Sequence, residues 1–461
     1  MTKDMTKGRP FGIILAFCLP MAAGSIFQQL YNMVDSIIVG QHVGVNAFSA
    51  VSMVGSVYFL VIGTATGICS GFAIPVSQRF GAGDYKGMRK TLYNAVLLSS
   101  AIALLLTALT VIFESELLDA MSTPKALYPH AFKYLLIIFC GIPVTIFYNF
   151  LSGILRALGD SRTPLKYLLI SSGINVVLDV TLIVGFEAGV AGAAAATVAS
   201  QLISGLLCLR YMVKNLPVLS FEEDELKADT ALMKSITAVG LPMAFQFSIT
   251  AVGSIILQTA VNKLGADSVA AMGAGQKIQN LIVQPMETLG ITMATFGGQN
   301  LGAGRLDRIH KGIREALIMQ MVYTVTIAAA VFFFGDTIAK IFIKSDAEDY
   351  LIILGQIRHF LRVTCLFYPI LGVLFLFRNL LQGLGFSAVT LLAGAIELAS
   401  RCFIAFGFVG RLGFDAACFA SPTAWSSAGI LLVFLYLIEI RRAEGRLTSR
   451  TFTQKPAHAV R

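Results

Sequence analysis

The feature that most constrains this chain is a series of long apolar stretches that follow one another over most of its length. A helix needs about 20 mostly apolar residues to cross a bilayer. By that rule the sequence predicts twelve spans, at residues 11–34, 46–76, 91–113, 131–154, 165–186, 189–212, 234–262, 268–299, 313–334, 356–381, 386–408 and 413–440. With 56% hydrophobic and 13% charged residues, the chain is too apolar for a water-soluble surface. We therefore expect an all-α integral membrane protein.

The basic residues indicate how the spans are oriented. If the amino terminus is cytoplasmic, the inner connections and termini hold about 25 of the 35 Lys and Arg residues and the outer connections about 8. The positive-inside rule then predicts a multi-pass protein of the plasma (inner) membrane with both termini in the cytoplasm. The basic residues form no aromatic-interleaved stripe, so the expected partner is the lipid bilayer and not a nucleic acid. We expect a monomer.

Short motifs recur in the two halves of the chain. The matching pairs are Leu19-Pro20-Met21 with Leu241-Pro242-Met243, residues 78–83 with 299–304, Pro143 with Pro369, and Leu158-Gly159 with Leu384-Gly385. Each half holds six predicted spans, so the repeat is parallel and places a central cavity between two six-helix bundles. The predicted organisation is an amino-terminal lobe at 1–212, a cytoplasmic linker with a solvated acidic run at 213–233, a carboxy-terminal lobe at 234–440 and a cytoplasmic tail at 441–461.

A carboxylate lies towards the end of the first span, in the stretch QQLYNMVDSIIVG at 28–40. Gln28, Asn32 and Asp35 are spaced at i, i+4 and i+7, so a helix places them on one face. A carboxylate within a bilayer costs roughly 2.5–3.5 kcal/mol and normally faces a protein interior or a water-filled cavity. Asp35 is therefore a candidate functional residue, with Tyr31 beside it. The alternative is an ordinary acid at the membrane edge.

The eighth span carries a second polar stripe. Its members share one helical face and are Gln276, Asn280, Gln284 and Glu287, with Lys277 beside them. Such a stripe is expected to line the cavity, although amides also join membrane helices to one another. Glu397 and Arg401 are spaced at i, i+4 and are interpreted as a structural ion pair. Lys277 has no acid in its own helix, and Glu287 or Glu397 is its candidate partner.

Four motifs, taken together, resemble one family. They are QQLYNMVDSIIVG, QRFGAG at 78–83, LSGILRALGDSRTP at 151–164, and NVVLDVTLIVG running into GVAGAAAATVASQ between 175 and 201. On these motifs, and on its twelve spans in two halves, the chain looks like a multidrug and toxic compound extrusion (MATE) transporter. The resemblance implies efflux of organic cations or other amphiphiles, driven by an inward H⁺ or Na⁺ gradient through alternating access.

One branch of that family has functional carboxylates on the first and fifth helices. The resemblance places them here at Asp35 and Asp179, with Asn175 one turn before Asp179 and Thr197 on the sixth helix; Asn149 on the fourth is a weaker match. Two neighbouring buried acids favour exchange of a proton. The same four residues, Asp35, Asp179, Asn175 and Thr197, would ligate Na⁺ in a sodium-coupled protein. No cofactor is expected besides the coupling ion, H⁺ or Na⁺.

Two rival functions agree less well with the sequence. A flippase for lipid-linked oligosaccharides would need several basic residues in the cavity for phosphates, and the intramembrane bases identified are Lys277 and Arg401. A membrane-embedded enzyme would need a catalytic constellation, and the sequence has no H-E-x-x-H, no G-x-S-x-G and no clustered histidines. We therefore expect a transporter and not an enzyme.

Overall fold

The computed structural model describes residues 3–121, 123–340 and 350–453, except for the side chains of residues 32–37, 40, 45, 48, 443 and 445–453. Within these ranges the regular structure is entirely helical. The first lobe consists of α1 (Pro10–His42), α2 (Val45–Met53), α3 (Gly55–Gly81), α4 (Tyr85–Ile112), α5 (Glu114–Ala120), α6 (Tyr128–Cys140), α7 (Ile142–Ala157), α8 (Arg162–Asp179), the π-helical η1 (Val180–Gly185) and α9 (Gly189–Asn215).

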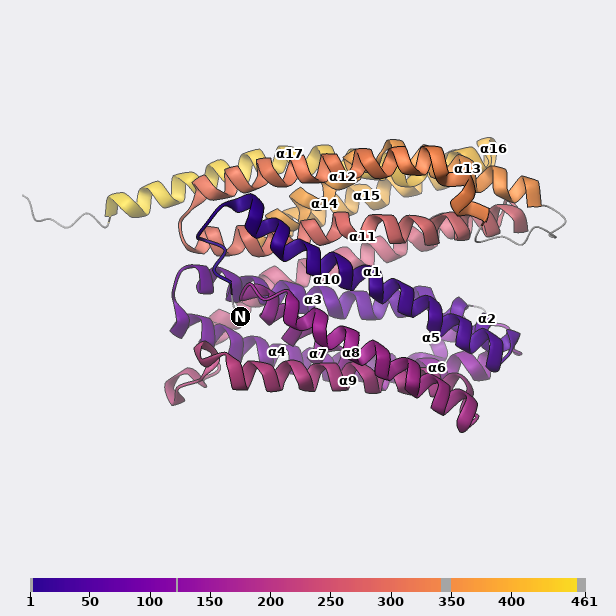
Figure 1. Ribbon diagram of the computed structural model, residues 1–461, viewed down its shortest axis with the longest axis horizontal. Helices are drawn as coiled ribbons and strands as arrows, with labels where there is room; N and C mark the ends of the chain where they lie inside the picture. The colour runs from indigo at the N-terminus through magenta and orange to yellow at the C-terminus, as the bar shows by residue number, and fades with distance from the viewer. Residues whose placement is uncertain (1–2, 122, 341–349, 454–461) are drawn as a thin grey trace, which may run out of the picture.

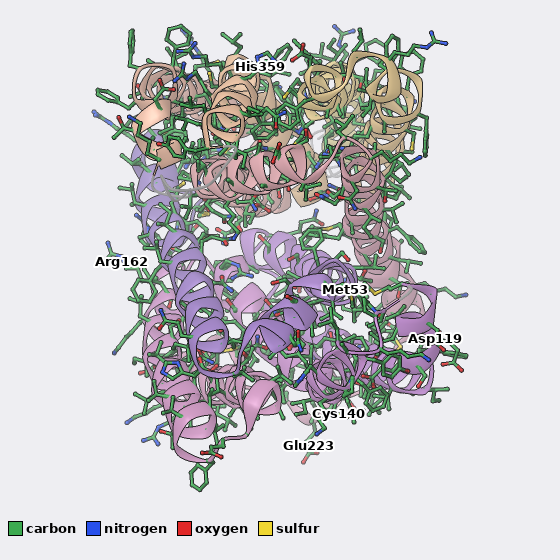
Figure 2. The ribbon with its side chains drawn as sticks, turned by 90° about the vertical axis from the view of Figure 1, so that its right-hand side faces the viewer. Met53, Asp119, Cys140, Arg162, Glu223 and His359 are labelled. Carbon is green, nitrogen blue, oxygen red and sulfur yellow. The ribbon has the colours of Figure 1, made fainter. Side chains whose placement is uncertain are left out.

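The second lobe repeats this order after a short connection. The connection holds the 3₁₀ turns η2 (Pro217–Leu219) and η3 (Glu223–Glu225). The helices that follow are α10 (Thr230–Asn262), α11 (Ala266–Gly302), α12 (Leu306–Lys340), α13 (Tyr350–Leu366), α14 (Tyr368–Gly383), α15 (Ser387–Gly407), α16 (Val409–Leu412) and α17 (Phe414–Thr453). Figure 1 shows the two lobes as stacked layers of roughly parallel helices, and Figure 2 shows the same layers along the helix axes.

Helix length and apolarity agree with the predicted spans. Among the described residues, nine helices are long and apolar enough to cross a membrane, and two bent pairs raise the number of spans to eleven. The twelfth predicted span is α11, which is 37 residues long and more polar because it carries the Gln276–Glu287 stripe. The fold is therefore an all-α membrane bundle.

The two bends occur at equivalent places in the lobes. The α6–α7 pair bends by 48° and the α13–α14 pair by 54°. Pro143 lies in the first turn of α7 and Pro369 in the first turn of α14. Proline lacks a backbone N–H and is tolerated in a first turn, where that group has no intrahelical partner. The prolines that matched in the sequence thus mark the same break in both lobes.

The lobes meet most closely along α3 and α10. Glycines let these two helices approach each other, since a Cβ added at Gly71 would lie 2.4 Å from the Cα atom of Gly240. Thr64 and Ser248 hydroxyls are 2.8 Å apart on the same pair of helices. Small residues at such contacts allow close packing of membrane helices.

One end of the molecule holds the segment before α1 and the connection between the lobes; we name it the linker end, and it lies on the left in Figure 1. There Gln78 Nε2 donates to the Gly383 carbonyl oxygen (3.0 Å), and Gln299 Nε2 donates to the Ala157 carbonyl oxygen (2.8 Å). Among the described residues, hydrogen bonds between the lobes run from the Thr64–Ser248 contact towards this end and not towards the opposite one. The linker end is therefore the closed end.

Candidate functional site

One face of α8 gathers polar side chains inside the first lobe. Ser172, Asn175 and Asp179 are spaced at i, i+3 and i+7, and their exposed fractions are 4%, 0% and 0%. Directly after Asp179 the helix continues as the π-helical η1. Single π-helical turns often occur at functional sites because they change the direction of the side chains around them. Ser172 was not predicted as a site residue, although its i, i+3 spacing from Asn175 places both on one helical face.

The Asn175 amide is enclosed without a protein partner among the described residues. Neither its oxygen nor its nitrogen forms a hydrogen bond with them, and the same holds for the Ser172 hydroxyl. A buried polar group of this kind costs roughly 1–3 kcal/mol when it is unsatisfied. In native proteins such groups bind water, an ion or a ligand. This face of α8 therefore has the donor and acceptor atoms of a binding site.

The neighbouring segments are α1, η1 and α9. A small apolar cluster of Val39, Ile183 and Ala193 joins the three of them. Thr197 follows Ala193 by one helical turn, which places it on the same side of α9, and its side chain is half-buried. The segments that carry the predicted site residues thus pack together.

The first-span residues are only partly described. The α1 helix continues through His42, but the side chains of Asn32 and Asp35 lie outside the described residues. Gln28 is exposed and Tyr31 is half-buried. The structure therefore brings the helical segment that carries Asp35 beside η1, and the placement of its carboxylate stays a prediction.

Asn149 belongs to a separate contact between α7 and α9. Its Nδ2 atom donates to the Thr145 carbonyl oxygen one turn earlier (2.9 Å). The Thr145 hydroxyl donates to Gln201 Oε1 on α9 (2.7 Å). Neither Thr145 nor Gln201 was predicted, because a helix-to-helix contact leaves no local pattern in the sequence.

The polar stripe of α11 lies on a helix that contacts both lobes, since α11 packs against α1 and α3 as well as α12 and α14. Asn280 and Lys277 are exposed, and Gln276, Gln284 and Glu287 are half-buried. With the described residues, none of the stripe's amide side chains forms a hydrogen bond to another helix. The packing alternative, in which these amides join helices, therefore has no contact to support it.

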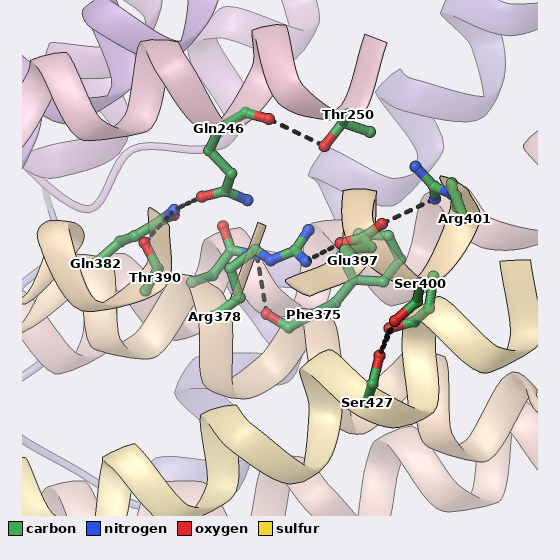
Figure 3. A network of polar contacts seen from close by, with 12 residues as sticks. Gln246, Thr250, Phe375, Arg378, Gln382, Thr390, Glu397, Ser400, Arg401 and Ser427 are labelled. Carbon is green, nitrogen blue, oxygen red and sulfur yellow. Dashed lines mark hydrogen bonds and ion pairs between the residues drawn. The ribbon is translucent and has the colours of Figure 1, made fainter. Parts of the chain in front are cut away.

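A buried ionic network lies inside the second lobe (Figure 3). Glu397 on α15 accepts from Arg401 Nη2 (2.8 Å) and from Arg378 Nη2 on α14 (2.5 Å). All three side chains are at most 8% exposed. The predicted Glu397–Arg401 pair is confirmed, and Arg378, within the predicted span 356–381, is an intramembrane base in addition to the predicted Lys277 and Arg401.

Two other sequence expectations need correction. Glu397 is held by the two arginines, so it is not the partner of Lys277. The acidic run of the linker is not entirely solvated, because the side chain of Glu225 is fully buried and forms an ion pair with Arg89 of α4.

Polar amides extend the second-lobe network, since Gln382 Nε2 donates to Gln246 Oε1 (2.5 Å) and to the Thr390 hydroxyl (3.3 Å).

Comparison with known proteins agrees with this architecture. The family model described as MatE matches residues 20–181 and 242–406, one match in each lobe. The chain is 29% identical to the probable multidrug resistance protein YpnP of Bacillus subtilis (strain 168), over 83% of this chain and 84% of that protein. It is 24% identical to the multidrug export protein MepA of Staphylococcus aureus (strain NCTC 8325 / PS 47), over 93% and 94%.

A solved structure shares the fold. It is an outward-facing conformation of a multidrug resistance MATE family transporter of the MOP superfamily, with a TM-score of 0.89 and 22% sequence identity. The alignment covers 96% of this chain and 99% of that one. Both lobes and their relative arrangement therefore have a counterpart among solved structures.

Proposed function

The chain belongs to the MatE family of membrane transporters, and from that premise we propose that it exports organic cations, drugs or other amphiphilic compounds in exchange for inward H⁺ or Na⁺. The observation that carries the proposal is the enclosed polar face of α8, with Asp179 and Asn175 at 0% exposure. A carboxylate kept away from water in an apolar bundle has a strong preference for a proton or a cation. Relatives named for multidrug export support the substrate class.

The coupling ion binds, in this proposal, at Asp35 and Asp179 with Asn175 and Thr197. A carboxylate accepts either a proton or a hard cation. The Asn175 amide offers both a donor and an acceptor, so it hydrogen-bonds the ionised and the protonated acid equally well. Both coupling ions are therefore compatible with the same set of atoms.

The lobes rock about the cavity between them in this proposal, and the linker end faces the cytoplasm. The excess of Lys and Arg in the connections of that end supports this orientation. The described state is then closed towards the cytoplasm, because the Gln78 and Gln299 contacts join the lobes there. Substrate meets the polar stripe of α11, a helix of the second lobe that contacts both lobes.

The runner-up function is a flippase for lipid-linked oligosaccharides. It would need cavity bases that are free to bind phosphate. Arg378 and Arg401 are buried and engaged with Glu397, which leaves Lys277 as the exposed base of the α11 stripe. A cavity with so few free basic side chains agrees better with export of cations and amphiphiles than with binding of lipid-linked phosphates.

Uptake of ethidium into inside-out vesicles tests the proposal. A pH gradient and a sodium gradient are imposed separately in vesicles with and without the protein. We expect accumulation with one of the two gradients. Accumulation with neither gradient, or with ATP alone, would contradict the proposed coupling.

A further inference from the structure

The segment before α1 crosses from the first lobe into the second. We name residues 3–9 the strap. Met5 is fully buried and belongs to the apolar core of the second lobe. Its N–H donates to Gln299 Oε1 (2.9 Å), and its carbonyl oxygen accepts from Asn300 Nδ2 (3.3 Å) and Arg308 Nη2 (3.0 Å). A segment that leads into the first lobe is thus hydrogen-bonded to α11 and α12 of the other.

Arg308 uses two nitrogen atoms to hold the strap and a third to hold Asn300. Nη1 donates to the Gly8 carbonyl oxygen (2.8 Å), Nη2 to the Met5 carbonyl oxygen, and Nε to Asn300 Oδ1 (2.9 Å). The residue is 9% exposed. A planar guanidinium with several fixed donors suits neighbouring carbonyl groups better than a lysine does. Arg308 therefore binds the strap directly and also orients the Asn300 amide, which donates to the Met5 carbonyl oxygen.

The other side of the strap touches the first lobe. A Cβ at Gly159, which has φ +83°, would lie 2.0 Å from the Lys3 carbonyl oxygen. Gln299, which accepts from the Met5 N–H, also donates to the Ala157 carbonyl oxygen. The strap is therefore enclosed between the end of α7 in one lobe and α11 and α12 in the other.

The second lobe has a comparable crossing. The connection before α10 returns to α4 of the first lobe, where Glu225 accepts from Arg89 Nε (2.6 Å) and Nη2 (2.7 Å). The Asp229 N–H donates to Asn94 Oδ1 (2.8 Å). The Arg89 hydrogen bonds hold the pKa of Glu225 at about 2, so the pair stays ionised at neutral pH. Each lobe is thus preceded by a segment that binds the other lobe at the linker end.

We propose that the strap is a latch that keeps the linker end closed, and that Arg308 is the positioning residue that holds it. This inference rests on the proposed alternating access, because the lobes part at this end only if the strap leaves one of its two sides. Release of the Met5 and Gly8 carbonyls from Arg308 is then part of opening. The latch acts through contacts that neither the predicted ion site nor the α11 stripe shares.

The first experiment compares two neighbouring arginines. Arg308→Gln removes the strap contacts, whereas Arg305→Gln removes only an exposed pair with Asp307. Spin labels on the exposed residues Tyr85 and Lys311 report the separation of the lobes in purified protein. We expect Arg308→Gln to raise the ratio of open to closed molecules about fivefold or more, with Arg308→Lys in between and Arg305→Gln unchanged. A folded Arg308→Gln protein with the wild-type distances would overturn the proposal.

A second experiment does not depend on the stability of Arg308 variants. Met5→Cys and Asn300→Cys, combined in one protein, allow an oxidant to fix the strap in place. We expect oxidation to reduce ethidium transport at least tenfold and a reductant to restore it. Equal transport by the oxidised and the reduced protein would overturn the latch. If neither the reduced protein nor the wild type transports ethidium, the result counts against the proposed function instead.

Discussion

Gln78 and Gln299 occupy equivalent positions in the two lobes, and each donates a side-chain hydrogen bond to a main-chain carbonyl of the other lobe. Their acceptors, Gly383 and Ala157, are also equivalent, since each precedes a Leu-Gly pair. The residues of the sequence repeat thus form a pair of matching contacts between the lobes at the linker end. The two contacts close that end from both sides of the repeat axis.

Two glycines allow the main chains to meet at these contacts. A Cβ at Gly81 would lie 2.0 Å from the Gln299 carbonyl oxygen, and one at Gly302 would lie 1.8 Å from the Gln78 carbonyl oxygen. Overpacking costs about 1–3 kcal/mol, so Gly81→Ala or Gly302→Ala should lower the closed population about tenfold or more. Distances between spin labels on the two lobes, together with ethidium transport, measure the effect.

The matched control for both variants is Gly12→Ala in α1. A Cβ at Gly12 would meet nothing within 4 Å, so this change should leave both readouts at the wild-type level. Transport and lobe distances of Gly81→Ala equal to those of Gly12→Ala would show that the close approach is not needed.

Glu397 forms ion pairs with both Arg378 and Arg401 in the apolar interior of the second lobe. Removal of one member of a buried ion pair costs roughly 3–5 kcal/mol, because a charge is left buried without its partner. Glu397→Gln should therefore lower the thermal unfolding midpoint and the folded yield in detergent. Asp307→Asn, which breaks the exposed pair with Arg305, should leave the unfolding midpoint close to that of the wild type, because solvent screens this pair. Equal losses in the two variants would contradict the buried network.

We expect the stability of the protein to depend on pH through Glu114, which lies at the end opposite the linker end. It is 1% exposed at the start of α5, and burial raises its pKa from 4.5 to about 7. An acid whose pKa is higher in the folded protein stabilises it fully below the unfolded pKa, and this contribution is lost as the pH rises through about 7. The wild type should thus lose stability between pH 5 and pH 8, and Glu114→Gln should lose less.

Thermal unfolding at the two pH values measures the Glu114 effect, with the exposed Glu116→Gln as the control. The control should keep the wild-type difference between pH 5 and pH 8. An unchanged difference in Glu114→Gln would show that this carboxyl does not titrate in the predicted window.

The membrane fold was predictable because it depends on local composition. Each span needs an apolar run, and the paired prolines Pro143 and Pro369 marked the positions of the two bends. The prolines favoured kinks at these places, but the break of each span into two helices was not predictable, since proline in a membrane helix is compatible with a straight or a broken span. The sequence shows Arg378 as a base within an apolar span. Its contact with Glu397 could not be predicted, because the two residues lie on different helices and no regular spacing in the sequence relates them.

The candidate site was predictable to a lesser degree. The family resemblance pointed to Asn175 and Asp179 as candidates, and their role stays a prediction; the structure adds Ser172 on the same face of α8. The strap had no pattern to find, because residues 3–9 are short, polar and without periodicity. Its partner Arg308 lies in the opposite half of the chain, and only the packing of the lobes brings the two together.

Asp35 tests whether the first span takes part in coupling. Asp35→Asn should keep the expression of the wild type and lose gradient-driven ethidium export about tenfold or more, because the neutral amide neither ionises nor binds a proton. Asp119→Asn, at an exposed acid of α5, is the control and should export normally. Normal export by Asp35→Asn would remove this residue from the mechanism.

The measurement that tests the central claim most directly is the movement of the coupling ion in response to substrate. In proteoliposomes, an imposed ethidium gradient should drive the opposite movement of H⁺ or of Na⁺, recorded with an internal pH dye and with radioactive sodium. We predict that the wild type and Asp119→Asn move one of the two ions and that Asp179→Asn moves neither. Ion movement by Asp179→Asn at the wild-type rate would contradict the assignment of coupling to the enclosed face of α8.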